Sequence, residues 1–127
     1  MSQYGKERLF NDLVLLGYRL IEHVHLTNGQ DYVVLRDFKI EHGIFKDSVI
    51  DLALLAPKEY PRTVGPSIQV KSNPHLLDKK DSVSGKRNII DSPLGAEWRY
   101  WSFRFMLSPN DPTKDLMTQI NGIFRNI

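Results

Sequence analysis

Asn28-Gly29 stands between two β-prone runs, and it constrains the fold of this chain more than any other sequence feature. Both residues tolerate positive φ, which the tight turns of β-hairpins require. Apolar and polar residues alternate over 18–26, which predicts the strand before the turn. β-Branched and aromatic residues in 30–40 predict its partner. We therefore expect an antiparallel hairpin near the beginning of the chain.

Periodicity predicts an element on each side of this hairpin. Leu9, Phe10, Leu13, Val14 and Leu16 have the three-and-four spacing of an amphipathic helix over 6–16, which Gly17 ends. After a turn at 41–43, the apolar run within 44–56 predicts a third strand, central in the sheet. The proline-containing segment 57–66 predicts an irregular connection, and 67–71 predicts a short fourth strand.

The C-terminal part of the chain begins with a polar segment. Residues 72–95 predict a long irregular loop, which in a compact domain is more often functional than idle. The aromatic segment 98–107 is expected to fold back over the core. Asp111 as N-cap and Pro112 at the first helical position predict a final helix. Its buried stripe is Leu116, Ile120, Ile123, Phe124 and Ile127. The whole order predicts an α+β fold: an N-terminal helix, a four-stranded antiparallel meander, an active-site loop and a C-terminal helix.

Composition excludes several classes of function. The chain has no cysteine, which rules out disulfides, thiolate metal sites and cysteine nucleophiles. Its net charge of +2 gives no strong electrostatic footprint for nucleic acid. His23 and His25 share one face of a predicted strand, and we interpret them as a half-exposed face rather than a metal site. We expect no metal and no cofactor.

Length and hydropathy indicate how the chain is organised. Its 127 residues suit a single domain, 1–127, with a core large enough to need no metal or disulfide. The longest apolar runs, such as 52–56, are far too short to cross a bilayer. No apolar secretory core follows the charged N-terminus. We therefore expect a cytoplasmic protein with no membrane partner.

Motifs along most of the chain resemble those of ubiquitin-conjugating enzymes. Tyr60-Pro61 follows the third predicted strand, and Pro66 precedes the fourth. Asn73-Pro74-His75 stands where that family has His-Pro-Asn, and Trp101-Ser102 matches its Trp-Ser pair. The segment 92–102, Ser-Pro-Leu-Gly-Ala-Glu-Trp-Arg-Tyr-Trp-Ser, is the most specific part of the resemblance. It is similar to the bacterial branch of the family that is found beside ubiquitin-like proteins.

Three residues become candidate catalytic groups through this resemblance. The family's interval before Trp101 leads to a position beside Ser92, which makes Ser92 the candidate acceptor for the C-terminus of a ubiquitin-like protein. His75 would stabilise the developing oxyanion or act as the base, and Asp91 would orient a base or an incoming amine. Each has a structural alternative: Ser92 opens a type I turn, His75 caps a turn, and Asp91 is a solvent-exposed loop residue. Ser82 and Ser84 are rival acceptors in the same loop.

The aromatic residues Trp98, Tyr100 and Trp101 are candidate binding residues, with core or the wall of a gate as the alternative. A serine hydroxyl is a poor nucleophile unless a neighbouring base removes its proton. The chain also departs from the family pattern in its missing cysteine, its altered tripeptide and the single helix after the tryptophans.

The resemblance implies a transferase that accepts a ubiquitin-like protein from an ATP-dependent activating enzyme, as an oxyester on Ser92. Its partners would be these two proteins and a deconjugating peptidase of the same operon, in a system such as antiphage defence. The alternative is a catalytically inactive relative that binds the ubiquitin-like protein or the activating enzyme as a scaffold. An α+β binding domain unrelated to this family is the third reading.

Overall fold

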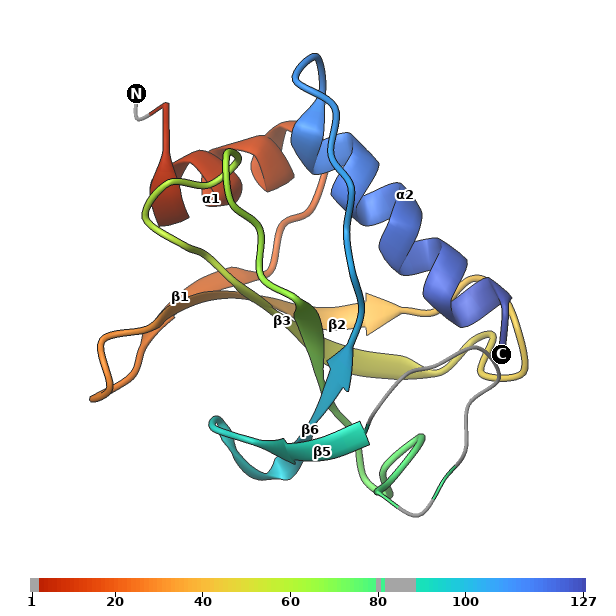
Figure 1. Cartoon of the computed structure of the whole chain (residues 1–127). Coiled ribbons are helices and arrows are strands. Elements are labelled where there is room, and N and C mark those ends of the chain that lie inside the picture. The colour runs from red at the N-terminus through yellow and green to blue at the C-terminus, as the bar shows by residue number, and fades with distance from the viewer. Residues whose placement is uncertain (1–2, 80, 82–88) are drawn as a thin grey trace.

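The computed structural model describes residues 3–79, 81 and 89–127, and its elements are arranged as Figure 1 shows. The first half holds helix α1 (Gly5–Leu15) and strands β1 (Ile21–His25), β2 (Asp31–Lys39) and β3 (Val49–Leu55). The second half holds β4 (Ser67–Lys71), β5 (Ile89–Ser92), β6 (Gly95–Ser102) and helix α2 (Pro112–Arg125). The fold is therefore α+β, as predicted.

All described strands form one antiparallel sheet in the order β1-β2-β3-β4-β6-β5. Its six strands exceed the four of the predicted meander, because β6 pairs with β4 and carries β5 on its outer side. The prediction that 72–95 is irregular is wrong, since this segment contains β5. The prediction for the aromatic segment holds only for its second half. Residues 98–102 belong to β6, whereas Phe103, Phe105 and Leu107 pack against the core.

The first hairpin forms at the predicted turn. The Leu26 amide donates to the Gln30 carbonyl at 2.8 Å, and the Gly29 amide donates to the Leu26 carbonyl at 2.9 Å. Two strands are shorter than predicted: β1 begins at Ile21, and β3 begins at Val49. Residues 40–48 instead form a compact loop that rests on the end of α2, where Gly43 leaves no space for a Cβ beside the Phe124 carbonyl.

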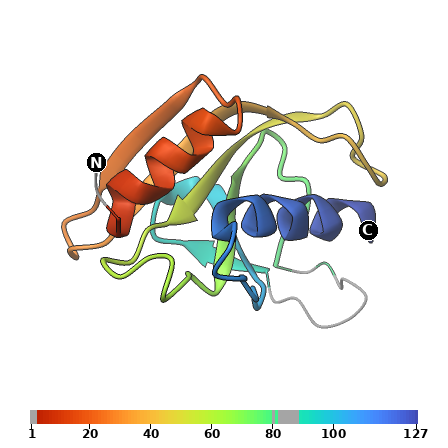
Figure 2. The ribbon, with the colours of Figure 1, turned by 90° about the horizontal axis from the view of Figure 1, so that it is seen from above.

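Both helices cover the same face of the sheet (Figures 1 and 2). Side chains from this face and from the helices form the main core, which includes Leu9, Leu13, Val33, Leu35, Leu52, Ile68, Trp101, Ile120 and Phe124. The predicted stripe of α2 is buried except for Ile127, which is partly buried. The stripe of α1 is narrower than predicted, since Leu9 and Leu13 are fully buried whereas Val14 and Leu16 are exposed.

Among the described residues, no helix covers the opposite face of the sheet (Figure 1). Tyr32, Val34, Ala53 and Trp98 form a small buried cluster there, and Val24, Leu26, Leu55 and Leu94 pack around it. Because side chains alternate between faces along a strand, β2 and β3 contribute to both clusters. This helix-free face is where the hydroxyl of Ser92 lies.

The irregular connection between β3 and β4 is anchored by Tyr60, which is fully buried. Its hydroxyl bonds the Thr113 hydroxyl at 2.7 Å, and the Thr113 hydroxyl donates to the Asp12 carboxylate at 2.6 Å. Burial raises the pKa of Tyr60 to about 12. This chain of hydrogen bonds joins the connection to both helices. Among the described residues, no helix is both long and apolar enough to cross a membrane.

Candidate functional site

Ser92 is the last residue of β5, and a tight hairpin turn at Pro93-Leu94 follows it. The Ser92 hydroxyl donates to the Gln69 side-chain oxygen at 2.8 Å and accepts from the Leu94 amide at 3.1 Å. The second bond is a local turn of the kind that serine often makes. The turn predicted at Ser92 is therefore present, as the link between two strands.

Gln69 fixes the position of the Ser92 hydroxyl from the middle of the sheet. It lies on β4, is 1% exposed, and its amide nitrogen donates to the Ser67 hydroxyl at 2.9 Å. A buried amide needs partners on both its oxygen and its nitrogen, and the two serines supply them. Ser67, Gln69 and Ser92 thus form a polar network on the helix-free face, which we call the serine–glutamine network.

His75 lies in a separate depression of about 580 Å³ beyond the end of β4. The residues that line it are Ser72, Asn73, Pro74, His75, Asp78, Asp81, Ala96 and Glu97. Nδ1 of His75 is buried and has no hydrogen-bond partner in the part of the chain that the structure describes. The lining carries three carboxylates, those of Asp78, Asp81 and Glu97. Among the described residues, no hydrogen bond joins His75 to Ser92.

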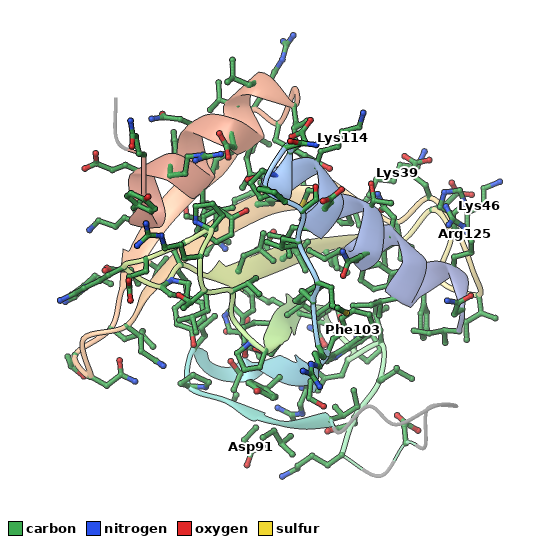
Figure 3. All side chains as sticks on the ribbon, turned by 45° about the horizontal axis from the view of Figure 1, so that its top comes forward. Lys39, Lys46, Asp91, Phe103, Lys114 and Arg125 are labelled. Carbon is green, nitrogen blue, oxygen red and sulfur yellow. The ribbon has the colours of Figure 1, made fainter. Side chains whose placement is uncertain are left out.

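Asp91 points away from the molecule (Figure 3), with its side chain 73% exposed. It lies opposite Arg99 in the sheet register, and its carboxylate is 3.1 Å from Lys79 Nζ and 3.9 Å from Arg99 Nη1. Its neighbour Ser92 turns its hydroxyl toward Gln69 instead. Since successive side chains of a strand face opposite ways, Asp91 and the Ser92 hydroxyl diverge.

Arg99 links Asp91 to the depression that holds His75. Its Nε donates to the Asp78 carboxylate at 2.6 Å, and this bond is the main reason why the pKa of Asp78 falls to about 2. The same bond raises the pKa of Arg99. Arg99 therefore favours the ionised form of the Asp78 carboxyl group. This ion pair holds the segment after β4 against β6.

The three aromatic candidates do not share one surface. Trp98 is 8% exposed and belongs to the cluster on the helix-free face, whereas Trp101 is fully buried in the main core against Phe124. The ring centroids of Trp101 and Phe124 are 5.6 Å apart. Tyr100 lies opposite Gln69 in the register and is half-buried. Trp98 and Trp101 thus pack on opposite sides of β6, one in each buried cluster.

The remaining candidates are two serines and two histidines. Ser82 and Ser84 lie outside the described residues. His23 stacks on Phe10 with ring centroids 4.6 Å apart, and His25 Nδ1 lies 2.6 Å from Asp31. The hydrogen bond from His25 lowers the pKa of Asp31. In the part of the chain that the structure describes, no group of three or more His, Asp and Glu residues could hold a metal ion.

Gln69, Asp78 and Arg99 are the site residues that the sequence did not point to. Gln69 stands inside a short β-prone run, where nothing marks it as the partner of a serine 23 positions later. Arg99 is a charged residue within an aromatic segment, and this position could have indicated that its side chain forms an ion pair. Comparisons with protein-family models, curated proteins and solved structures gave no match.

Proposed function

We propose that this chain is a non-catalytic member of the ubiquitin-conjugating-enzyme-like group, which binds a ubiquitin-like protein or its activating enzyme as a scaffold. Three features support the fold part of the proposal. A helix precedes four strands that pair in consecutive antiparallel order, Tyr60-Pro61 follows the third of them, and Trp101-Ser102 lies before the last helix. The added β5–β6 hairpin departs from the predicted four-stranded meander.

The observation that carries the proposal is the hydrogen bond from the Ser92 hydroxyl to Gln69. Attack by serine on a thioester forms the ester bond, releases the thiol of the activating enzyme and requires a base to take the serine proton. A glutamine amide oxygen accepts a hydrogen bond but does not take up a proton near neutral pH. The serine–glutamine network therefore holds Ser92 in place without activating it.

The serine-acceptor hypothesis stays a prediction, and the geometry favours it less. It requires His75 or another base to replace Gln69 as the partner of Ser92. His75 instead lines a depression that does not include Ser92 among its walls. Asp91 faces solvent and is paired with Lys79.

Intact-mass measurement separates the two functions. The chain is mixed with a bacterial ubiquitin-like protein, the activating enzyme of that protein and Mg-ATP, and binding is followed by size-exclusion chromatography. We expect a complex with one or both proteins but no gain in the mass of this chain. A fluorophosphonate probe, which labels activated serines, should leave Ser92 unmodified.

Ser92→Ala is the matched control for this experiment. A mass gain that hydroxylamine removes and that Ser92→Ala abolishes would establish the transferase and overturn the scaffold proposal. A mass gain that persists in Ser92→Ala would assign the acceptor to another residue, such as Ser82 or Ser84. Failure to bind either protein would reject both functions.

A further inference from the structure

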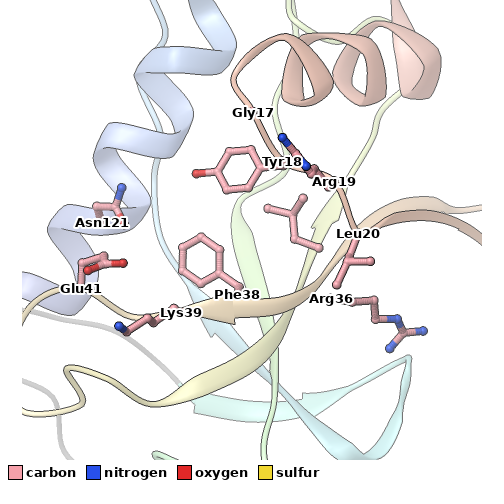
Figure 4. Close-up of a pocket in the computed structure, with 10 residues that line it drawn as sticks. Gly17, Tyr18, Arg19, Leu20, Arg36, Phe38, Lys39, Glu41 and Asn121 are labelled. Atoms are coloured by element: carbon pink, nitrogen blue, oxygen red, sulfur yellow. The ribbon is translucent and has the colours of Figure 1, made fainter.

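Strand β1 forms one outer edge of the sheet. Among the described residues only β2 pairs with it, and Figure 2 shows it on the side of α1 that faces away from α2. Its ladder with β2 is longer than the strand itself, because the Arg36 amide donates to the Leu20 carbonyl and the Leu26 amide donates to the Gln30 carbonyl, both at 2.8 Å. Leu20 and Arg36 also line a depression of about 370 Å³ at the start of this ladder (Figure 4). The edge therefore runs over 20–26.

The backbone groups of this edge point outward at every second residue. In an antiparallel ladder, opposite residues alternate between pairs that exchange hydrogen bonds and pairs that do not. Leu20 and Leu26 bond to β2. The odd-numbered residues between them, Ile21, His23 and His25, therefore direct their N–H and C=O groups away from β2. Among the described residues no strand receives these groups, and an unpaired row of this kind is a template for another extended chain.

The edge is complementary to itself about His23. A two-fold axis at this residue places His23 opposite its own copy and Ile21 opposite His25 of the second copy. Every outward N–H and C=O group of the three residues then has a partner. On the other face of the sheet, Leu20, which is 56% exposed, comes opposite Leu26 of the second copy. This aliphatic pair forms twice, once at each end of the shared ladder.

The charges of the edge are compatible with the same register. The Glu22 carboxylate lies 2.7 Å from Arg36 of its own chain, so its charge is already balanced. The axis at His23 places Glu22 opposite Val24 of the second copy rather than opposite another carboxylate. Like charges directly opposite each other destabilise a strand pair, and this register avoids them for Glu22.

We propose that β1 pairs antiparallel with β1 of a second copy, about a two-fold axis at His23, and that the chain forms a homodimer whose sheet is continuous across both copies. One strand from each copy makes a small interface, so the dimer should be reversible and depend on concentration. The inference goes beyond the proposed function, since it does not depend on whether the chain belongs to a ubiquitin-like system.

Sedimentation velocity of the full chain over a range of concentrations tests the proposal. We expect a monomer that converts to a dimer as the concentration rises. His23→Glu should raise the dissociation constant roughly tenfold or more, because it places two carboxylates opposite each other. His42→Glu is the matched control, since it makes the same change at an exposed residue of the loop between β2 and β3. It should leave the dimer unchanged, and circular dichroism should show both variants folded.

A disulfide tests the register directly, because the chain has no cysteine of its own. Opposite residues of a hydrogen-bonded antiparallel pair have Cα atoms about 5.5 Å apart, which is within the range that a disulfide spans. Under mild oxidation, His23→Cys should therefore form a covalent dimer much faster than His42→Cys does.

Three results would overturn the proposal. The first is a chain that stays monomeric up to about 1 mM. The second is a dimer that His23→Glu does not weaken, and the third is an equal rate of cross-linking in His23→Cys and His42→Cys. A monomeric chain whose complex with a ubiquitin-like protein is weakened by His23→Glu would also overturn it, by assigning this edge to a strand of another protein.

Discussion

At the residue scale, Tyr60 connects three segments that are far apart in the sequence. Its hydroxyl meets Thr113 at the start of α2, and Thr113 meets Asp12 on α1. Asp12 also accepts from Arg8 at 2.8 Å. A buried hydroxyl costs free energy when it loses its partner, so this network should matter for stability more than a surface ion pair does.

Tyr60→Phe should lower the free energy of unfolding by about 1 kcal/mol, because Thr113 loses a hydrogen-bond partner while the ring still fills the core. Urea denaturation measures this loss. Tyr32→Phe is the control, since the Tyr32 ring is also buried but its hydroxyl makes a long hydrogen bond, 3.4 Å, to the Gln30 side-chain oxygen. An equal loss in both variants would contradict the role of the network.

The same substitution has a pH signature. The pKa of Tyr60 rises from 10.0 to about 12 on folding, so the protonated hydroxyl favours the folded state below pH 10. That contribution is lost as the pH rises from 10 through 12. The stability of the wild type should therefore fall toward that of Tyr60→Phe over this interval, as urea midpoints at several pH values would show.

Residue chemistry alone could predict part of the candidate site. Serine and proline in 92–95 predicted the turn, and alternation along a strand separates Asp91 from the Ser92 hydroxyl. The Gln69 partner could not be predicted, because β4 meets β5 only through the placement of β6 between them in the sheet. The depression that holds His75 likewise combines residues of 72–81 with Ala96 and Glu97, which are distant in the sequence.

At the element scale, the loop between β2 and β3 is fitted to the end of α2. Gly43 has φ of +81°, and a Cβ built there collides with the Phe124 carbonyl oxygen. Gly29, in the first hairpin, has a similar φ of +90°, but a Cβ there meets nothing within 4 Å. An alanine at either position would therefore have similar backbone strain. The two positions differ in the room for a Cβ, which is free at Gly29 and blocked at Gly43.

Gly43→Ala should be more destabilising than Gly29→Ala. Both variants incur roughly 1–2 kcal/mol for an alanine in the left-handed region. Gly43→Ala adds the cost of overpacking against a helix backbone, typically about 1–3 kcal/mol. Thermal or urea unfolding of the two variants measures the difference, and equal losses would show that the loop does not rest on α2 in solution.

Periodicity predicted the elements that are local in sequence and missed those that are not. Both helices and β1 to β4 were expected from spacing and turn residues, although β1 and β3 proved shorter. Strand β6 was not predicted, because Trp98 and Trp101 are both buried on opposite faces of the sheet. The strand therefore lacks the apolar–polar alternation of a half-buried strand. Its partner β4 precedes it by more than 20 residues, and no pattern in the sequence indicates that pairing.

At the scale of the whole molecule, one sheet joins two unequal clusters of buried side chains. The helices cover the larger cluster, and the helix-free face carries the smaller one together with the serine–glutamine network. The α+β class follows from the order of the elements, which the sequence indicated. The extra hairpin adds strands at the edge of the sheet and places Ser92 beside Gln69.

The placement of the two tryptophans on opposite faces of β6 gives the protein a pair of built-in fluorescent reporters. In Trp98→Phe the remaining emission reports on the core beneath the helices, and in Trp101→Phe it reports on the helix-free face. Because one strand carries both rings, we expect fluorescence and far-ultraviolet circular dichroism to give the same urea midpoint within each variant. An earlier fluorescence change in Trp101→Phe alone would mean that the helix-free face loosens before the rest of the molecule unfolds.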